Sequence, residues 1–389
     1  MRPSLTIACR TTIVTLAALV SGCSNTSPYL AGGTPQLVQS HARGISGSLA
    51  EFVYVANFGS GNVSAYAIGA GGTLMPVTGS PFAAGYEPDN VAIDPEGDFA
   101  YVTNNGSNDV SVYAINASSG VLTPVAGSPF ATGTNPSVAV EPNGKFAYVT
   151  NQGSNNISAY TVKASSGALT PMTGSPFNTS VQPIGLAVDP KGKFAYVACY
   201  AVSHVYAYAI NPSSGALTRV NGSPFRTALY PRFVTVDPTG RYAYVTTVSG
   251  AVSAYSIATN GALKKLMRSP NEANTGPFGL VVAPNGKFVY VANYVSNNVF
   301  GYVLDSDGSL KNVPGSPFAA GSFPQKVAVD STSKFVYVTN YSSGNVAAYA
   351  IAGNGALTQL AGSPFAAGTA PVGIATCSVT AGKCIPPPL

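Results

Sequence analysis

The sequence carries little charge for a chain of 389 residues. Charged residues make up 8%, whereas a soluble globular domain usually carries about 25%, and hydrophobic residues make up 46%. These values exclude a disordered chain, a polyelectrolyte and a coiled coil. The formal net charge of +5 is modest, and no basic stripe suited to a phosphate backbone is present. We therefore expect no nucleic-acid partner.

Residues that bind metals are scarce as well. The histidines are His41 and His204, and the sequence holds five cysteines. Because zinc takes three or four ligands of these types, we expect no metal site and no cofactor. Besides the short run at residues 11–20, the sequence has no long apolar run, so we expect no membrane-spanning segment.

The N-terminus has the pattern of an export signal. Two arginines, Arg2 and Arg10, precede the apolar run at residues 11–20, which has about half the length that a membrane span needs. The run ends in Val-Ser-Gly-Cys at residues 20–23, which resembles the lipobox of bacterial lipoproteins. The resemblance implies a signal peptide at 1–22, lipidation of Cys23 and a flexible tether at 23–50. We expect an exported protein on the periplasmic or cell-surface face of a bacterial membrane; the alternative is an ordinary signal peptide.

Export would determine the oxidation state of the remaining cysteines. Cys9 leaves with the signal peptide, so Cys199, Cys377 and Cys384 remain besides Cys23. An exported protein meets oxidising surroundings, and Cys377 and Cys384 lie close together near the C-terminus. We expect a disulfide between Cys377 and Cys384, which leaves Cys199 unpaired.

Glycine and proline are abundant, with 42 and 30 copies, but the strict three-residue period of collagen is absent. The chain instead repeats a unit of 46 to 48 residues. Each unit opens on an aromatic-led segment such as FVYVAN or FAYVTN. These segments begin at Phe52, Phe99, Phe146, Phe194, Tyr242, Phe288 and Phe335.

Each unit predicts four short strands, which is the size of one propeller blade. Along the chain, the aromatic-led strand is followed by a Gly-Ser-Asn type of loop and another strand. The next strand runs into Gly-Ser-Pro-Phe, and the last strand of the unit begins after a proline. The sequence therefore predicts an all-β, seven-bladed β-propeller with four-stranded blades over residues 51–377, followed by a tail at 378–389. The last strand, at 372–376, has no following partner, so we expect it to close the ring by pairing with residues 52–57.

Several repeated residues have a structural explanation. Asp94, Asp189 and Asp237 each precede a proline and have a glycine three positions on, which suits a type I turn better than paired catalytic acids. The alternating Tyr and Phe positions predict packing between blades. The proline of each Gly-Ser-Pro-Phe copy predicts an outer edge strand.

The recurring Tyr-Val-Thr-Asn, at 101–104, 148–151 and 337–340, resembles the YVTN-repeat propellers. More broadly the chain is similar to the lactonase-type seven-bladed propellers, which include 6-phosphogluconolactonase and a muconate-lactonising enzyme.

The resemblance implies a site at one mouth of the central channel. There the family has a Pro-Arg-His, and this sequence has Pro-Arg-Phe at 231–233, so it keeps the arginine, Arg232. The family's glutamate position falls near Thr247, and its second histidine and its aspartate correspond to Pro183-Ile184 and Cys199-Tyr200-Ala201. Lactone hydrolysis needs a general base and a donor to the oxyanion, and these positions keep the donor alone.

One unit departs from the others. It carries Tyr200 and His204 where the other units have Gly-Ser-Asn, and Arg226 and Arg232 follow in and after its last loop. Because these loops open on the same face of a propeller, the four side chains predict a rim that binds a carboxylate or phosphate. The alternative is a set of solvated side chains in a repeat that has diverged.

Two functions follow from these observations. The first is a monomeric, lipid-anchored module of the cell envelope that binds another envelope protein or a small anionic ligand. The second is a lactonase-like hydrolase of the 6-phosphogluconolactonase type with a rearranged channel site, for which Arg232 and His204 are the catalytic candidates.

Overall fold

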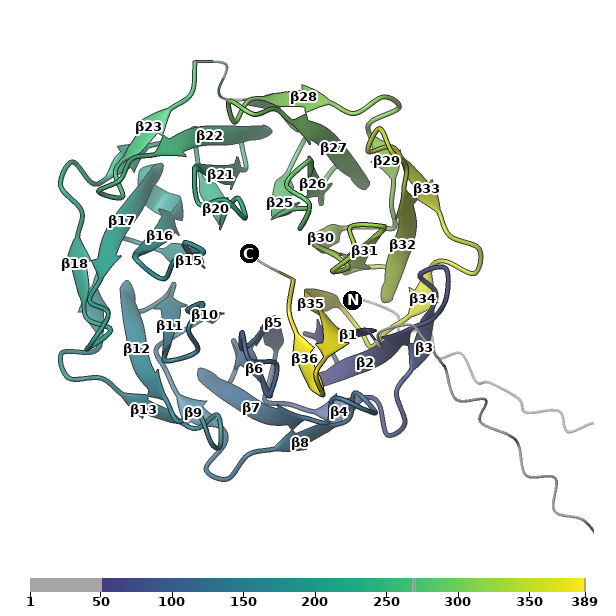
Figure 1. The fold of residues 1–389 in the computed structure, drawn as a ribbon, viewed down its shortest axis with the longest axis horizontal. Coiled ribbons are helices and arrows are strands. Elements are labelled where there is room, and N and C mark those ends of the chain that lie inside the picture. Colours follow the sequence, from purple (N-terminus) through teal and green to yellow (C-terminus); the bar gives the residue numbers. More distant parts are fainter. Residues whose placement is uncertain (1–50, 268, 270, 388–389) are drawn as a thin grey trace, which may run out of the picture. The chain divides into compact units, whose positions relative to one another are not determined.

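A computed structural model describes residues 51–267, 269 and 271–387. These residues form seven β-sheets arranged as blades around a central axis (Figure 1). We number the blades 1 to 7 along the chain, with blade 1 containing the first strand. Apart from one turn of 3-10 helix, η1 (Tyr200–Val202), the described residues form no helix. The predicted seven-bladed propeller is confirmed.

Each blade has an innermost, a second and a third strand, all antiparallel to their neighbours. The innermost strands, in the order of blades 2 to 7 and then 1, are β5 (Pro88–Ile93), β10 (Pro136–Val140), β15 (Pro183–Val188), β20 (Pro231–Val236), β25 (Pro277–Val282), β30 (Pro324–Val329) and β35 (Pro371–Thr380). The second strands of blades 1 to 7 are β1 (Glu51–Asn57), β6 (Phe99–Asn104), β11 (Phe146–Asn151), β16 (Phe194–Cys199), β21 (Tyr242–Thr247), β26 (Phe288–Asn293) and β31 (Phe335–Asn340). The third strands are β2 (Asn62–Ile68), β7 (Asp109–Ile115), β12 (Asn156–Val162), β17 (His204–Ile210), β22 (Ala251–Ile257), β27 (Asn298–Leu304) and β32 (Asn345–Ile351).

The outer strand of every blade is split into two short pieces, where the sequence predicts one continuous strand. Both pieces pair with the third strand. The first pieces are β3 (Leu74–Pro76), β8 (Leu122–Pro124), β13 (Leu169–Pro171), β18 (Leu217–Arg219), β23 (Leu263–Lys265), β28 (Leu310–Asn312) and β33 (Leu357–Gln359). The second pieces are β4 (Phe82–Ala83), β9 (Phe130–Ala131), β14 (Phe177–Asn178), β19 (Phe225–Arg226), β24 (Asn271–Glu272), β29 (Phe318–Ala319) and β34 (Phe365–Ala366).

The split falls at the Gly-Ser-Pro-Phe copies. In blade 2, for example, the Ser128-Pro129 bond is cis and the Ser128 hydroxyl oxygen accepts the N–H of Val112 in the third strand at 2.9 Å. The side chain therefore takes a ladder hydrogen bond that the interrupted outer strand leaves open. The same serine contact recurs in each of the seven blades.

The ring closes as the sequence predicts. In blade 1, β1 pairs with β35, with Phe52 opposite Cys377 and Val55 opposite Ile374. β35 runs on to Thr380, past the predicted end of the propeller at 377, and β36 (Lys383–Ile385) pairs back onto it. Part of the predicted tail at 378–389 is thus β-structure.

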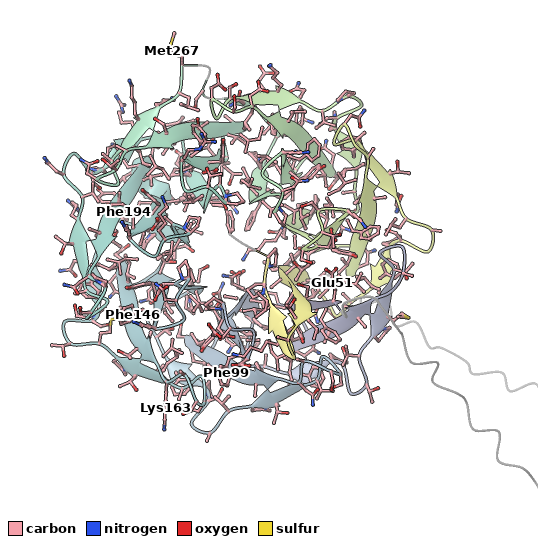
Figure 2. The ribbon with its side chains drawn as sticks, viewed as in Figure 1. Glu51, Phe99, Phe146, Lys163, Phe194 and Met267 are labelled. Atoms are coloured by element: carbon pink, nitrogen blue, oxygen red, sulfur yellow. A yellow bond between two sulfur atoms is a disulfide. The ribbon has the colours of Figure 1, made fainter. Side chains whose placement is uncertain are left out.

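The core lies between neighbouring blades. Aromatic residues that open second strands, such as Phe99, Phe146 and Phe194, lie between sheets, whereas Met267 is fully exposed at the perimeter (Figure 2). Second strands such as β6 and β11 are buried along their whole length. This is the inter-blade packing that the alternating aromatic positions predict.

The aspartates predicted to stabilise turns do so. Asp189 accepts backbone N–H groups of Lys193 and Phe194 at 2.6 Å, and Asp237 accepts those of Arg241 and Tyr242 at 2.7 Å. Their carboxylates are used within the turn, which agrees with a structural role.

Candidate functional site

All innermost strands begin at the same end of the ring, which we call the crossover face. Each begins after a crossover from the preceding blade, and the hairpin between the second and third strands lies beside that crossover. In blade 4, for instance, the Tyr200 N–H donates to the Gln182 carbonyl at 2.9 Å, and in blade 5 the Val248 N–H donates to the Tyr230 carbonyl at 3.0 Å. The crossover face therefore brings the hairpins and crossovers together around the channel mouth.

Bulges shape this mouth. Six of the seven pairings between innermost and second strands shift register near the crossover face, and the pairing of β10 with β11 is the regular one. A β-bulge bends a strand and redirects its side chains. Glycines also let neighbouring innermost strands approach closely. A Cβ at Gly185 would lie 2.6 Å from the Arg232 carbonyl oxygen, and one at Gly279 would lie 2.7 Å from the Lys326 Cα.

Arg232 lies on the bulge of β20 among aromatic rings. Its guanidinium carbon is 4.7 Å from the ring centroid of Phe278, 5.4 Å from that of Tyr294 and 5.7 Å from that of Tyr200. These distances allow cation–π attraction on several sides. The Nε atom is buried without a hydrogen-bond partner, and no ion pair to Arg232 is formed within the described chain. The guanidinium is thus held in place with donor capacity left over.

The aromatic rings form a continuous group beside Arg232. Tyr200 packs against Tyr230 with centroids 5.1 Å apart, Phe278 meets Tyr294 edge-on at 6.2 Å, and Tyr294 packs against Phe323 at 6.2 Å. Tyr230 and Phe323 are each almost half exposed. Large exposed aromatics beside a cation are typical of a binding surface.

The structure divides the four-residue rim predicted from the sequence. Tyr200 contacts Arg232, but His204 and Arg226 face each other in β17 and β19, in the outer half of blade 4. The His204 Nδ1 contacts the Val202 carbonyl oxygen, and Arg226 is exposed. Within the described residues, no hydrogen bond, ion pair or ring contact joins His204 or Arg226 to Arg232. The register explains this, because Cys199 pairs with His204 and so sets His204 at the start of a third strand.

The other positions taken from the lactonase resemblance carry no general base. Phe233 replaces the histidine after Arg232, and Thr247 is fully buried, with its hydroxyl donating to the Ala251 carbonyl at 3.0 Å. Cys199 is also fully buried, and burial raises the pKa of its thiol to about 11. A thiol that stays protonated is a poor base or nucleophile.

Sequence reasoning missed Lys326. This lysine lies on the bulge of β30, is almost fully buried, and donates from Nζ to Asn90 Oδ1 at 2.8 Å and to the Asp89 carbonyl oxygen at 3.4 Å. Its Nζ is 6.0 Å from the ring centroid of Phe233. Burial lowers the pKa of Lys326, and the Asp89 charge opposes that shift. The signal in the sequence was a lysine in an innermost strand, a class of strand that is otherwise largely apolar.

The structure describes three of the five cysteines. Cys377 and Cys384 form a disulfide, and Cys199 is free. Cys23 and the segments 1–22 and 23–50 lie outside the described residues. Within the described residues, no three His, Cys, Asp or Glu side chains group together so as to hold a metal ion. A helix long and apolar enough to cross a membrane is likewise not found in the part of the chain that is described.

The described residues thus form a seven-bladed β-propeller with an arginine and several aromatic side chains at one mouth of its channel. Comparison with known proteins assigns the family. The family described as "Lactonase, 7-bladed beta-propeller" matches residues 41–136, 127–227 and 223–316, and the chain belongs to it. No curated protein sequence matches the chain.

Solved structures with the same fold come from several bacteria. A candidate 6-phosphogluconolactonase of Bacteroides fragilis aligns with a TM-score of 0.75 at 21% identity, over 84% of this chain and 98% of that one. The periplasmic gluconolactonase PpgL of Pseudomonas aeruginosa aligns with a TM-score of 0.71 at 20% identity, over 84% and 99%. At this identity the likeness shows the fold.

Proposed function

We propose that the chain is a binding module of the cell envelope whose crossover face captures a small anionic ligand through Arg232. The observation that carries the proposal is the guanidinium of Arg232, which lies between three aromatic rings with a buried, unpartnered Nε and without an ion pair among the described residues. A guanidinium fork binds a carboxylate or a phosphate through two parallel hydrogen bonds. The surrounding rings exclude water and strengthen that contact.

The neighbouring rings narrow the class of ligand. Tyr200, Tyr230 and Tyr294 offer flat apolar faces beside the cation, and their hydroxyl groups can donate or accept hydrogen bonds. An acidic sugar combines an anionic group with a face that can stack on a ring and with hydroxyl groups. Gluconate and 6-phosphogluconate are therefore suitable probes.

The test measures the binding of gluconate and 6-phosphogluconate by isothermal titration calorimetry. In Arg232→Ala we expect the dissociation constant to rise at least about tenfold, as loss of a charge-assisted hydrogen bond predicts. Arg226→Ala is the matched control, because it removes an exposed arginine of the preceding blade that has no contact with Arg232. Arg232→Lys, which keeps the charge and loses the fork, should recover part of the affinity. Equal affinity in Arg232→Ala and the parent protein would overturn the proposal.

Lactone hydrolysis is the second candidate, favoured by membership of the lactonase family. Arg232 would serve as the donor to the oxyanion, and a base would have to come from outside the positions that the family uses. The test is turnover of sugar lactones, including 6-phosphogluconolactone, above the spontaneous rate. Turnover that disappears in Arg232→Ala and persists in His204→Ala would establish hydrolysis at the mouth. If no lactone is hydrolysed while gluconate and 6-phosphogluconate still bind, the result would favour the binding module over the hydrolase.

We also propose that Cys23 anchors the chain to a bacterial membrane. The support is the apolar run at residues 11–20 followed by Val-Ser-Gly-Cys, and the name of the Pseudomonas aeruginosa protein places that protein in the periplasm. The lipid on Cys23 would bury methylene groups in the membrane, and each buried methylene group contributes about 0.8 kcal/mol to attachment. Cys23→Ser should move the protein from the membrane fraction to the soluble fraction. Continued sedimentation of this variant with membranes would contradict the anchor.

A further inference from the structure

A cavity of about 500 Å³ lies inside the ring of innermost strands. Side chains from all seven innermost strands line it, and most of the lining is apolar. The residue opposite the second-strand tyrosine is alanine in five of these strands, namely Ala92, Ala139, Ala187, Ala328 and Ala375. Small side chains at this level keep the channel open along its axis. The volume lies within the range of about 300 to 1,000 Å³ that is usual for small-molecule sites.

A buried lysine, Lys326, lies at the end of the cavity near the crossover face. Lys326 Nζ donates to Asn90 Oδ1, and Asn90 Nδ2 in turn donates to the Val138 carbonyl oxygen at 3.0 Å and lies 3.3 Å from Ser137 Oγ. The hydrogen-bond partners of Nζ are an amide and a backbone carbonyl, and no ion pair to Lys326 is present in the described part of the chain. An ammonium group has three donors, so one remains available.

The opposite end is apolar. Ile385, Pro386 and Pro387 line the cavity there, together with prolines of the turns between innermost and second strands, such as Pro95 and Pro142. The C-terminal segment reaches this position because β36 folds back from β35 over the ring (Figure 1). A backbone hydrogen bond from Cys384 to Gly97 and ion pairs from Lys383 to Glu96 and Asp98 hold it.

The two ends therefore differ in polarity. Burial disfavours the charged form of Lys326, and the Asp89 charge opposes this effect only in part. A carboxylate placed beside Nζ would supply both an opposite charge in direct contact and an acceptor for the free donor. The apolar walls would hold the rest of such a ligand by the hydrophobic effect. Innermost strands of this length span about 17 to 20 Å, which suits a medium-length unbranched chain.

From this geometry we infer that the central channel binds a medium-chain fatty acid, with its carboxylate at Lys326 Nζ and its hydrocarbon chain directed toward Ile385 and the C-terminal prolines. The site is separate from Arg232 and goes beyond the proposed function. A sugar acid would bring hydroxyl groups into a largely apolar cavity, which disfavours it. A neutral alcohol of the same length would leave Lys326 without a direct ion pair.

The experiment is calorimetric titration of the purified protein with dodecanoate, dodecanol and gluconate. We expect dodecanoate to bind one molecule per chain at least tenfold more tightly than dodecanol, and gluconate not to compete with it. Equal affinity for dodecanoate and dodecanol, or no binding of dodecanoate, would overturn the inference with the unaltered protein alone.

Two variants locate the ligand within the channel. Lys326→Met should reduce dodecanoate affinity to that of dodecanol and leave the thermal midpoint unchanged or raised, because an apolar residue of similar length replaces a buried charge. Ala187→Phe should abolish binding of both compounds by filling the channel. Lys311→Met is the matched control, since Lys311 is exposed and paired with Asp305 on the outside of blade 6. Full dodecanoate affinity in folded Lys326→Met or Ala187→Phe would exclude the channel as the site.

Discussion

A tyrosine of each second strand crosses to the following blade and donates its hydroxyl group to a glycine carbonyl there. The same position does this all the way around the ring. The seven bonds run from Tyr54 to Gly120, Tyr101 to Gly167, Tyr148 to Gly215, Tyr196 to Gly261, Tyr244 to Gly308, Tyr290 to Gly355 and Tyr337 to Gly72. Third-strand tyrosines such as Tyr160 bond back to the preceding blade, to the Ala131 carbonyl at 2.7 Å. Neighbouring blades are thus joined by directional bonds as well as by apolar packing.

Removing one of these hydroxyl groups should destabilise the whole ring. Tyr148→Phe loses a 2.7 Å bond and leaves the buried Gly215 carbonyl without its partner. The free energy of unfolding should fall by about 1 to 3 kcal/mol, which urea titration measures. Tyr86→Phe is the control, because the Tyr86 side chain is 68% exposed. Equal losses in both variants would show that the inter-blade bond contributes nothing.

Asp94 should make the stability depend on pH. Burial raises the pKa of this carboxyl group to about 6, and the N–H of Phe99 at 2.7 Å opposes that shift. Because the pKa is higher in the folded state than the usual value of 3.8, Asp94 stabilises the fold below about pH 4, and this contribution is lost as the pH rises through about 6.

The measurement compares the protein with Asp94→Asn by urea unfolding between pH 4 and pH 7. The parent protein should lose on the order of 2 kcal/mol relative to the variant across this range. Burial also raises the pKa of Glu51, but that contribution is common to both proteins and cancels. A difference that stays constant with pH would refute the assignment to Asp94.

The asparagine that ends a second strand ties three elements of a blade together. In blade 3, Asn151 Oδ1 accepts the N–H of Gly133 in the crossover, while Nδ2 donates to Asn156 and Ser158 in the third strand. Blades 1, 2 and 7 repeat the bond to the crossover glycine. In blades 4 and 5 the position is Cys199 and Thr247. These are the blades that carry Tyr200 and Arg232, so the repeat diverges where the candidate site lies.

Loss of this asparagine should loosen the crossover. Asn151→Ala removes bonds of 3.0, 2.7 and 2.8 Å, and we expect the free energy of unfolding to fall by about 2 to 3 kcal/mol. Amide exchange at Gly133 should become faster, because its N–H loses its acceptor. Cys199→Ala, at the equivalent position of blade 4, should cost about 1 kcal/mol for a small void. The interpretation fails if exchange at Gly133 is unchanged in Asn151→Ala.

Repetition made the strands predictable, but the bulges depend on contacts between blades. The prediction of an innermost strand in each unit was correct because a proline marks the start of every one of them. Lys326 lies on a bulge of β30 that closely approaches Gly279, and this contact joins residues of different repeats. His204 was misplaced for a related reason. Loops on one face suggest a cluster, whereas the pairing of His204 with Arg226 keeps both in the outer half of the blade.

The closure of the ring was predictable because the repeats are offset from the chain ends. The first complete element is a second strand and the last is an innermost strand, so each lacks a partner until they meet. Propellers leave few free edges when the two ends of the chain share a blade. The added strand β36 was not foreseen, since it forms outside the repeat and is held by the disulfide and by contacts to Gly97.

Two truncated chains test separately the pairing of β1 with β35, which closes the ring, and the contribution of β36 and its disulfide to stability. A chain ending at Thr380 keeps β35 paired with β1 and loses β36, the disulfide and the Lys383 ion pairs. It should remain folded and monomeric with a free energy of unfolding lower by about 2 to 3 kcal/mol, because the hydrogen bonds of β36 to β35 and the packing of Cys384 in the core are lost.

A chain ending at Ala370 loses β35 altogether. The buried strand β1 then becomes a free, apolar edge, and the core of blade 1 is exposed to water. We expect this chain to aggregate or to fail to unfold cooperatively, as judged by size-exclusion chromatography and thermal unfolding. If it eluted as a stable monomer while the chain ending at Thr380 did not, the fold would depend on β36 and the disulfide rather than on the pairing of β1 with β35.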